Sequence, residues 1–157
     1  MDEKEEYMKQ TIKVQKAVEL SAWYQKDKDN LGALSIKSRW NLKKNMLEID
    51  KIANQFNEFK ESTMQAFRDS YINNDKTFRE EDQDGRELFK IKPEFIDDWR
   101  KEMGEINAKL AEVAEEENEV ELHEIDMEAE IERMPDDAAL SDAAMNALMM
   151  FMPNKEV

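Results

Sequence analysis

The sequence predicts a mainly α-helical protein, with a long antiparallel helix pair, flanking helices and a small β element. The chain has 157 residues but only three Gly and three Pro, so few residues would interrupt a helix. Charged residues make up 39% and apolar residues 40%, a balance typical of exposed amphipathic helices. Two long stretches carry apolar residues three and four apart, the spacing of a helix with one buried face.

The first predicted helix covers residues 3–28, where apolar residues recur four positions apart. These pairs are Met8 and Ile12, Val14 and Val18, and Leu20 and Tyr24. A polar turn over residues 27–30 then leads to the central helix, expected from about Ile36 to about Tyr71. Its stripe is Leu42, Met46, Ile49, Ala53 and Phe56, widened by Leu47, Ile52 and Phe59. Ser35 is the expected N-cap of this helix.

Residues 77–91 are expected to form two short strands or an ordered loop around the turn dipeptide Asp84-Gly85. Glu80, Asp82 and Asp84 also resemble the front of a calcium loop. The bidentate acid that such a loop needs at position twelve is replaced by Ile91, so a plain turn is the favoured interpretation.

A second long helix is expected to begin at Pro93 and to pair antiparallel with the central helix, because the connection between them is short. Its apolar spacing is three-four-three-four-three. The stripe is Ile96, Trp99, Met103, Ile106, Leu110 and Val113.

Residues 115–132 carry ten acidic side chains and no Lys or Arg. Strand and helix remain alternatives for residues 119–131, with an extended strand near Val120–Met127 favoured because like charges repel along a helix face. Ser141 is the expected N-cap of a last helix, which Pro153 ends. The chain shows no internal repeat and no low-complexity linker, which predicts a single domain over residues 1–157.

Several classes of protein are disfavoured by composition. Cys is absent, so disulfides, thiolate nucleophiles and Cys-ligated zinc are excluded. The acidic start does not resemble a signal peptide, and no stretch has about 18 consecutive apolar residues, the length of a membrane span. These features predict a soluble cytoplasmic protein, with no cofactor and no metal.

Three further features have both a functional and a structural interpretation. His123, flanked by Glu121 and Glu124, is more simply a surface histidine than a base or ligand. The methionine-rich segment 145–152 fits core packing better than an interface. A basic-aromatic cluster is more simply core aromatics with solvated lysines than a phosphate-binding or base-stacking site. Its members are Trp23, Lys37, Arg39, Trp40, Lys43 and Lys44.

The acidic run is the main functional candidate. The net charge is −15, and residues 105–157 hold 16 acidic against 3 basic side chains, so nearly all the excess lies in the last third. Such a surface disfavours direct contact with nucleic acid or an anionic membrane and favours a basic partner. The expected protein-binding residues are Glu115, Glu116, Glu117, Glu119, Glu121, Glu124, Asp126 and Glu128.

The order of features resembles a family of short, uncharacterised tailed-phage proteins of Gram-positive hosts. Three segments carry the resemblance: Leu34–Leu42 opening a long helix, Glu119–Ile125 after the Asp84-Gly85 turn, and Leu140-Ser141 before a short terminal helix. The resemblance implies a phage origin and an accessory role in the host cytoplasm. It assigns no activity and no catalytic residue.

The sequence therefore predicts a non-enzymatic, phage-type accessory protein. It would bind and modulate a host or phage protein, with a nucleic-acid-handling defence protein as one candidate partner, through its acidic last third. Closely spaced carboxylates can mimic the phosphate row of a nucleic acid in the basic groove of such a partner. The alternative is a structural or assembly component that forms a homo-oligomer through the terminal helix.

Overall fold

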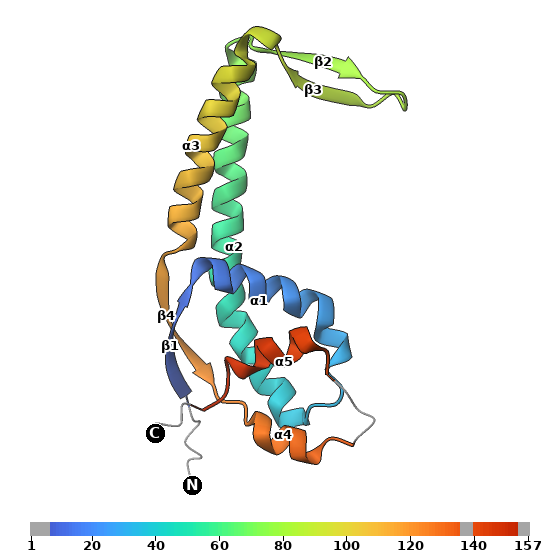
Figure 1. Ribbon diagram of the computed structural model, residues 1–157, viewed down its shortest axis with the longest axis vertical. Helices are drawn as coiled ribbons and strands as arrows, with labels where there is room; N and C mark the ends of the chain where they lie inside the picture. The colour runs from blue at the N-terminus through green and yellow to red at the C-terminus, as the bar shows by residue number, and fades with distance from the viewer. Residues whose placement is uncertain (1–6, 136–139, 154–157) are drawn as a thin grey trace. The chain divides into compact units, whose positions relative to one another are not determined.

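The computed structural model describes residues 7–135 and 140–153. Figure 1 shows the elements in chain order from blue to red. The strands are β1 (Tyr7–Lys13), β2 (Thr77–Glu81), β3 (Glu87–Ile91) and β4 (Glu117–His123). The helices are α1 (Val14–Asp27), α2 (Ile36–Asn73), α3 (Ile96–Ala114), α4 (Met127–Arg133) and α5 (Asp142–Met149), with short 3-10 turns at Lys28–Asn30 and Pro93–Phe95. The mainly α fold with a small β component is confirmed.

The chain forms two compact units. Unit 1 comprises Met1–Phe56 and Glu115–Val157, and unit 2 comprises Asn57–Ala114. The long helix α2 contributes its first part to unit 1 and its last part to unit 2. The single domain expected from the sequence stays a prediction.

Unit 1 contains a two-stranded antiparallel ribbon, in which β1 pairs with β4 from Tyr7 opposite His123 to Lys13 opposite Glu117. The ladder continues one step further, since the Val14 N–H donates to the Glu116 carbonyl at 3.0 Å. Side chains alternate between the core and the exterior along both strands. The core-facing members with buried side chains are Met8, Ile12, Val120 and Leu122.

The predicted helix over residues 3–28 is wrong over Tyr7–Lys13, which is a strand, and the helix begins at Val14. Residues 3–6 lie outside the described part of the chain. Residues four apart share a face in a strand as well as in a helix, so the spacing of Met8 and Ile12 fits both structures. The deciding contact is the pairing with β4, more than a hundred residues away in sequence.

The core of unit 1 is organised around α2. Leu42, Met46, Ile49 and Ala53 are each at most 1% exposed, as the predicted stripe requires, whereas Phe56, its fifth member, is half-buried. Buried side chains from the other elements of unit 1 pack with this stripe: they include Leu20, Leu34, Leu122, Ile125, Met127, Leu148 and Phe151. The predicted widening of the stripe is only partly observed, since Ile52 is half-buried whereas Leu47 and Phe59 are exposed.

Side-chain caps begin three of the helices. The Ser38 N–H donates to Ser35 Oγ at 3.2 Å at the start of α2, and the Ala144 N–H donates to Ser141 Oγ at 3.1 Å at the start of α5. Both predicted N-caps are therefore confirmed. Asp126 caps α4 in the same way, accepting from the Ala129 N–H at 3.1 Å. The strand predicted near Val120–Met127 is therefore correct only as far as His123, and a helix begins at Met127, where the Asp126 cap starts it.

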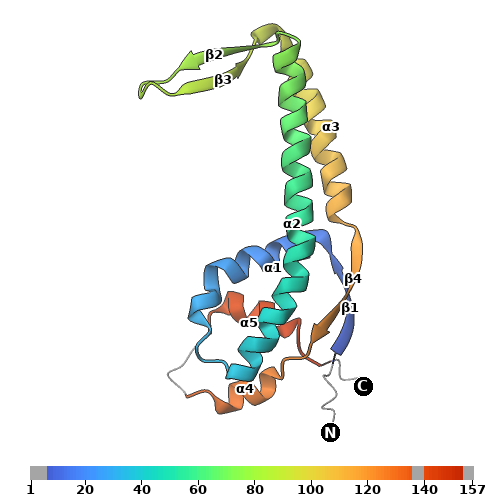
Figure 2. The same cartoon turned by 180° about the vertical axis from the view of Figure 1, so that it is seen from behind.

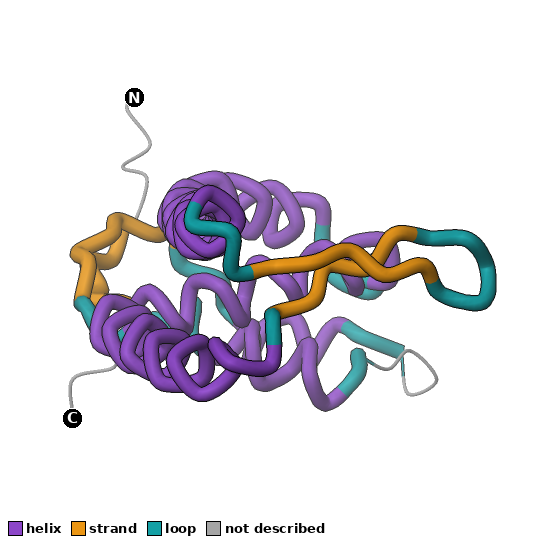
Figure 3. Tube along the Cα trace, turned by 90° about the horizontal axis from the view of Figure 1, so that it is seen from above, coloured by secondary structure: helices purple, strands orange, loops and turns teal. Residues whose placement is uncertain are grey.

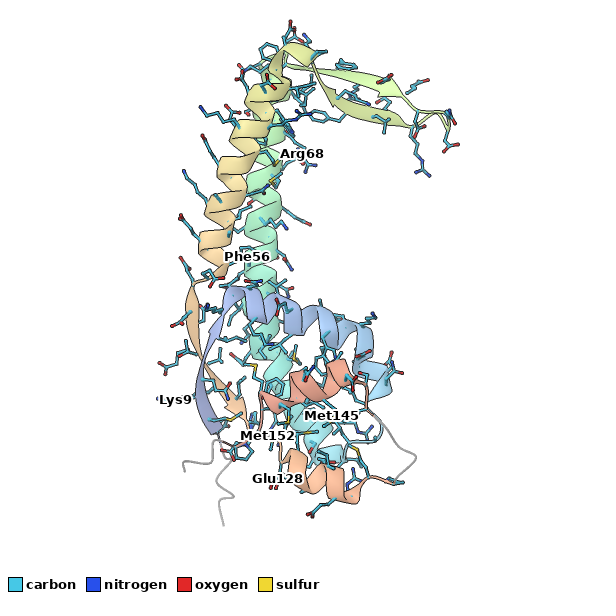
Figure 4. All side chains as sticks on the ribbon, viewed as in Figure 1. Lys9, Phe56, Arg68, Glu128, Met145 and Met152 are labelled. Carbon is cyan, nitrogen blue, oxygen red and sulfur yellow. The ribbon has the colours of Figure 1, made fainter. Side chains whose placement is uncertain are left out.

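The methionine-rich end packs mainly into the core of unit 1. Leu148 and Phe151 are fully buried, and Met145, Met150 and Met152 lie against the core cluster. Figure 4 labels Met145 and Met152 at the two ends of this segment. The helix itself ends at Met149, short of Pro153, and the Ile125 N–H donates to the Phe151 carbonyl at 2.8 Å.

Unit 2 is an antiparallel helix pair, in which the last part of α2 runs beside α3 (Figures 1 and 2). Trp99 of α3 stacks on Phe67 of α2 at a ring distance of 4.4 Å and meets Tyr71 edge-on at 5.0 Å. The Tyr71 hydroxyl donates to the Glu102 carboxylate at 2.7 Å. Burial and this carboxylate raise the pKa of Tyr71 to about 12. The predicted pairing of the two long helices is confirmed.

Strands β2 and β3 form a hairpin, so of the two structures expected for residues 77–91 the strands are observed. Gly85 has a φ of +78°, which favours glycine at this position of the turn. Asp82 Oδ1 accepts from the Asp84 and Arg86 N–H groups, both at 2.9 Å. Asp82, one of the acids that resemble a calcium loop, therefore uses its carboxylate to hold the turn, as the favoured interpretation of a plain turn expects.

Candidate protein-binding surface

The outward side of the β1–β4 ribbon carries half of the eight carboxylates that the sequence singled out. Glu117, Glu119 and Glu121 occupy alternate positions of β4 and are exposed. Opposite them on β1 stand Lys13, Thr11 and Lys9, which are also exposed, and Tyr7 lies opposite His123 at the end of the same face. Figure 4 shows the Lys9 side chain on the outer side of the ribbon. We call this surface, with Glu115 at its end, the acidic ribbon face.

Helix α2 holds the ribbon in place through two asparagine side chains. Asn45, which is 1% exposed, donates from Nδ2 to the His123 carbonyl at 2.9 Å. Its Oδ1 accepts from the His123 N–H at 2.6 Å, so one side chain satisfies both backbone groups of that residue. Asn41 adds a bond from Nδ2 to the Glu124 carbonyl at 3.3 Å. These bonds close part of the strand edge that β1 does not cover.

Two lysines of β1 lie beside the carboxylates of the acidic ribbon face. The Lys13 Nζ is 2.7 Å from Glu115 Oε2, and the Lys9 Nζ is 3.9 Å from Glu119 Oε1. The hydrogen bond to Glu115 and its charge, with a smaller contribution from Glu117, raise the pKa of Lys13. The face therefore carries lysines between some of its glutamates. Exposed ion pairs of this kind add little to the stability of the fold.

The remaining predicted site residues are placed elsewhere. Glu116 is exposed and extends the ribbon through its backbone carbonyl. Glu124 is half-buried, and Asp126 is occupied in capping α4. Glu128 is exposed on α4. The structure thus gathers Glu115, Glu117, Glu119 and Glu121 on one ribbon and assigns the others to different surfaces.

Glu130 has a structural role that the sequence did not indicate. Its carboxylate is buried and accepts hydrogen bonds from the Ser35 hydroxyl, the Ser35 N–H at 3.0 Å and the Ser38 hydroxyl at 2.5 Å. Arg133 adds a bond at 3.0 Å. A carboxylate at this position satisfies donors at the start of α2 and interacts favourably with the positive end of the helix. Its serine partners lie more than ninety residues away in sequence, so nothing local distinguishes Glu130 from the other acids of the run.

These contacts also determine the protonation of Glu130. Burial alone would raise its pKa, but the hydrogen bonds from Ser35, Ser38 and Arg133 outweigh burial and lower the pKa to about 2. The carboxylate lines a pocket of about 270 Å³ together with Lys37, Asn41, Glu124 and Asp126. Both serine hydroxyls donate to Glu130, and Ser35 also caps α2, so this cluster joins the start of α2 to α4.

The basic-aromatic cluster is divided between the core and the surface. Trp23 packs against the core of unit 1, as the structural interpretation expects, whereas Trp40 is 57% exposed. The Lys44 Nζ lies 5.8 Å from the Trp40 ring centroid. His123 is half-buried, with its ring 4.6 Å from that of Tyr7, so it is a less exposed residue than the sequence suggested.

Comparisons with protein-family models, curated proteins and solved structures give no match to this chain. Across residues 7–135 and 140–153, no three His, Cys, Asp or Glu side chains are grouped so that they could hold a metal ion. No helix in the same ranges is both long and apolar enough to span a membrane.

Proposed function

We propose that this chain is a non-enzymatic, phage-type accessory protein that binds and modulates a host or phage protein through the acidic ribbon face. The observation that carries the proposal is the display of Glu117, Glu119 and Glu121 on one side of a strand whose other side is core. The phage origin and the accessory role rest on the family resemblance described above.

The ribbon presents its carboxylates in a fixed register. Val120 and Leu122 are buried on the inner side of β4, so a slip by one residue would bury glutamates and expose these side chains. Asn45 fixes the position of His123 at the end of the same strand. Preorganisation of this kind lowers the entropic cost of binding.

The partner suited to this face carries a basic groove. Alternate residues of a strand are about 7 Å apart, so the three glutamates form a regular row. A nucleic-acid-handling protein offers a matching row of Lys and Arg, and mimicry of a phosphate backbone would be one way to occupy it. The lysines interleaved on β1 favour a partner with some complementary acidic groups.

The test uses a variant in which Glu117, Glu119 and Glu121 are all changed to Gln. We expect the wild-type chain to recover a nucleic-acid-binding protein from nuclease-treated host lysate, and we expect the purified partner to bind the variant at least tenfold more weakly in calorimetry. Circular dichroism should show the same fold, since all three side chains are exposed.

A matched control changes the same number of charges elsewhere. Glu58, Glu61 and Glu105 are exposed residues of unit 2, and their change to Gln alters the net charge equally. At matched salt this control should bind like the wild type. Equal affinity of both variants and the wild type would contradict the proposal.

Assembly through segment 145–152 has less support. Leu148 and Phe151 are used in the core, which leaves Met149, at 51% exposed, as the accessible large apolar side chain of the segment. Substitution of Met149 by Lys is therefore a specific test for oligomerisation through this helix.

A further inference from the structure

The β2–β3 hairpin of unit 2 has open edges. Within residues 7–135 and 140–153, β2 and β3 pair only with each other. Figure 3 shows them as a narrow ribbon that extends from the ends of the two helices of this unit to a loop. A two-stranded ribbon of this kind is marginally stable in water by itself, and an open edge is a template for another strand.

Alternate residues of β2 hydrogen-bond to β3, and the backbone groups of the others face the open edge. The Lys92 N–H donates to the Lys76 carbonyl at 3.0 Å, and the Asp82 N–H donates to the Arg86 carbonyl at 2.9 Å. Hydrogen-bonded pairs alternate with non-hydrogen-bonded pairs in an antiparallel ladder, so the even-numbered residues of β2 bond to β3. The residues whose backbone groups point to the open edge are Thr77, Arg79 and Glu81.

The hairpin also exposes large apolar side chains. Phe78 is 39% exposed, and Leu88 and Phe89 are each 40% exposed. Phe78 and Leu88 share the face that also carries Glu80 and Lys90, which are 3.7 Å apart. Phe89 lies on the other face, where its ring is 6.1 Å from that of Trp99.

The possible self-pairings of this edge differ in whether they set like charges opposite one another. Residues 76–82 form the β2 side of the ladder. For the two copies to hydrogen-bond, residues whose backbone groups point to the open edge must pair with the same kind of residue in the second copy. A register centred on Arg79, Glu80 or Glu81 sets that charged residue opposite the same residue of the second copy, so like charges meet at its centre. A register centred on Thr77 opposes no like charges, but it pairs only residues 76–78 of each copy.

The remaining register is centred on Phe78. It sets Phe78 opposite Phe78 of the second copy and sets Lys76 opposite Glu80 of that copy, twice by symmetry. The β3 edge does not offer such a pairing. If residues 86–92 of two copies pair with the correct hydrogen-bonding pattern, every register sets two like charges opposite each other.

We propose that two copies of this chain associate through β2, antiparallel and centred on Phe78, to form a four-stranded sheet from two hairpins. The contact is isologous, so the same edge serves both copies. The association does not depend on the acidic ribbon face. The variant that replaces Glu117, Glu119 and Glu121 by Gln should dimerise like the wild type.

The test exploits the absence of native cysteine. In the proposed dimer the two Phe78 Cα atoms form a non-hydrogen-bonded pair about 4.5 Å apart, which lies within the range that a disulfide spans. We expect Phe78→Cys to form a covalent dimer under mild oxidation at micromolar concentration. Leu88→Cys, with an equally exposed position on the same face, should cross-link about tenfold more slowly or less.

Sedimentation of the full chain gives a second measurement. The wild type should be a reversible dimer in the micromolar range, and Arg79→Pro should shift it to monomer. Proline at this position removes an N–H that faces the open edge, so the hairpin ladder itself is retained. A wild-type monomer throughout that range, or equal cross-linking at positions 78 and 88, would overturn the proposal.

Discussion

At the scale of single residues, Glu130 is a charged side chain that stabilises the fold from a buried position. It belongs to the most acidic stretch of the chain, yet its carboxylate is buried at the start of α2 and bonded to Ser35, Ser38 and Arg133. A buried carboxylate is stable only where hydrogen bonds and positive charge replace its hydration. The first turn of α2 and Arg133 supply both.

The lowered pKa of Glu130 predicts a defined dependence of stability on pH. The pKa falls from an ordinary value of 4.5 to about 2 on folding, so its contribution to stability is complete above pH 4.5 and is lost as the pH falls towards 2. The shift corresponds to up to about 3 kcal/mol. We expect Glu130→Gln to be less stable than the wild type at pH 7, and most of this difference should be gone by about pH 2.

Urea denaturation at a series of pH values measures this difference directly. Glu132→Gln, an exposed acid of the same helix, serves as the control and should track the wild type throughout. A constant difference between Glu130→Gln and the wild type across the range would show that the carboxylate is not selectively stabilised.

At the scale of elements, the ribbon depends on α2 for the backbone groups that β1 leaves open. Asn45 is an amide in the middle of an apolar stripe, between Leu42 and Ile49, and both of its polar ends bond to His123. Its burial is therefore compatible with the rule that buried polar groups are hydrogen-bonded.

We expect Asn45→Ala to destabilise the protein by about 2–4 kcal/mol, because a backbone donor and a backbone acceptor lose their partners. Asn54→Ala changes an exposed residue of the same helix and should cost well under 1 kcal/mol. Chemical denaturation at pH 7 compares the two variants. Equal stabilities would mean that water replaces the asparagine at His123.

At the scale of the whole molecule, one helix runs through both compact units, since α2 extends from Ile36 to Asn73. Each unit has its own aromatic reporters. Trp23 packs on the core of unit 1, and Trp99 lies among the rings of unit 2. Continuity of a helix couples the folding of the residues it contains, because helix formation is cooperative.

The predicted single domain can be tested with tryptophan fluorescence. A variant with Trp23→Phe and Trp40→Phe reports on unit 2, and a variant with Trp40→Phe and Trp99→Phe reports on unit 1. We expect both to unfold in urea at the midpoint that circular dichroism gives for the same variant. Two separate midpoints within one variant would show that the units unfold independently.

Local signals in the sequence were sufficient for the two long helices and for several caps and turns. The stripes of α2 and α3, the caps Ser35 and Ser141 and the turn at Gly85 were all predicted, because each depends on residues within a few positions of one another. The same is true of the mainly α fold and the pairing of the two long helices.

Only the tertiary structure determined the pairing of β1 with β4 and the positions of the acidic side chains in residues 115–132. Tyr7–Lys13 became a strand because Glu117–His123 pairs with it, and that contact has no local signature. It also decided which acids face outward on β4, that Asp126 caps a helix and that Glu130 is buried. Ten acids in eighteen residues are chemically alike in sequence, and they are distinguished only by partners brought close when the chain folds.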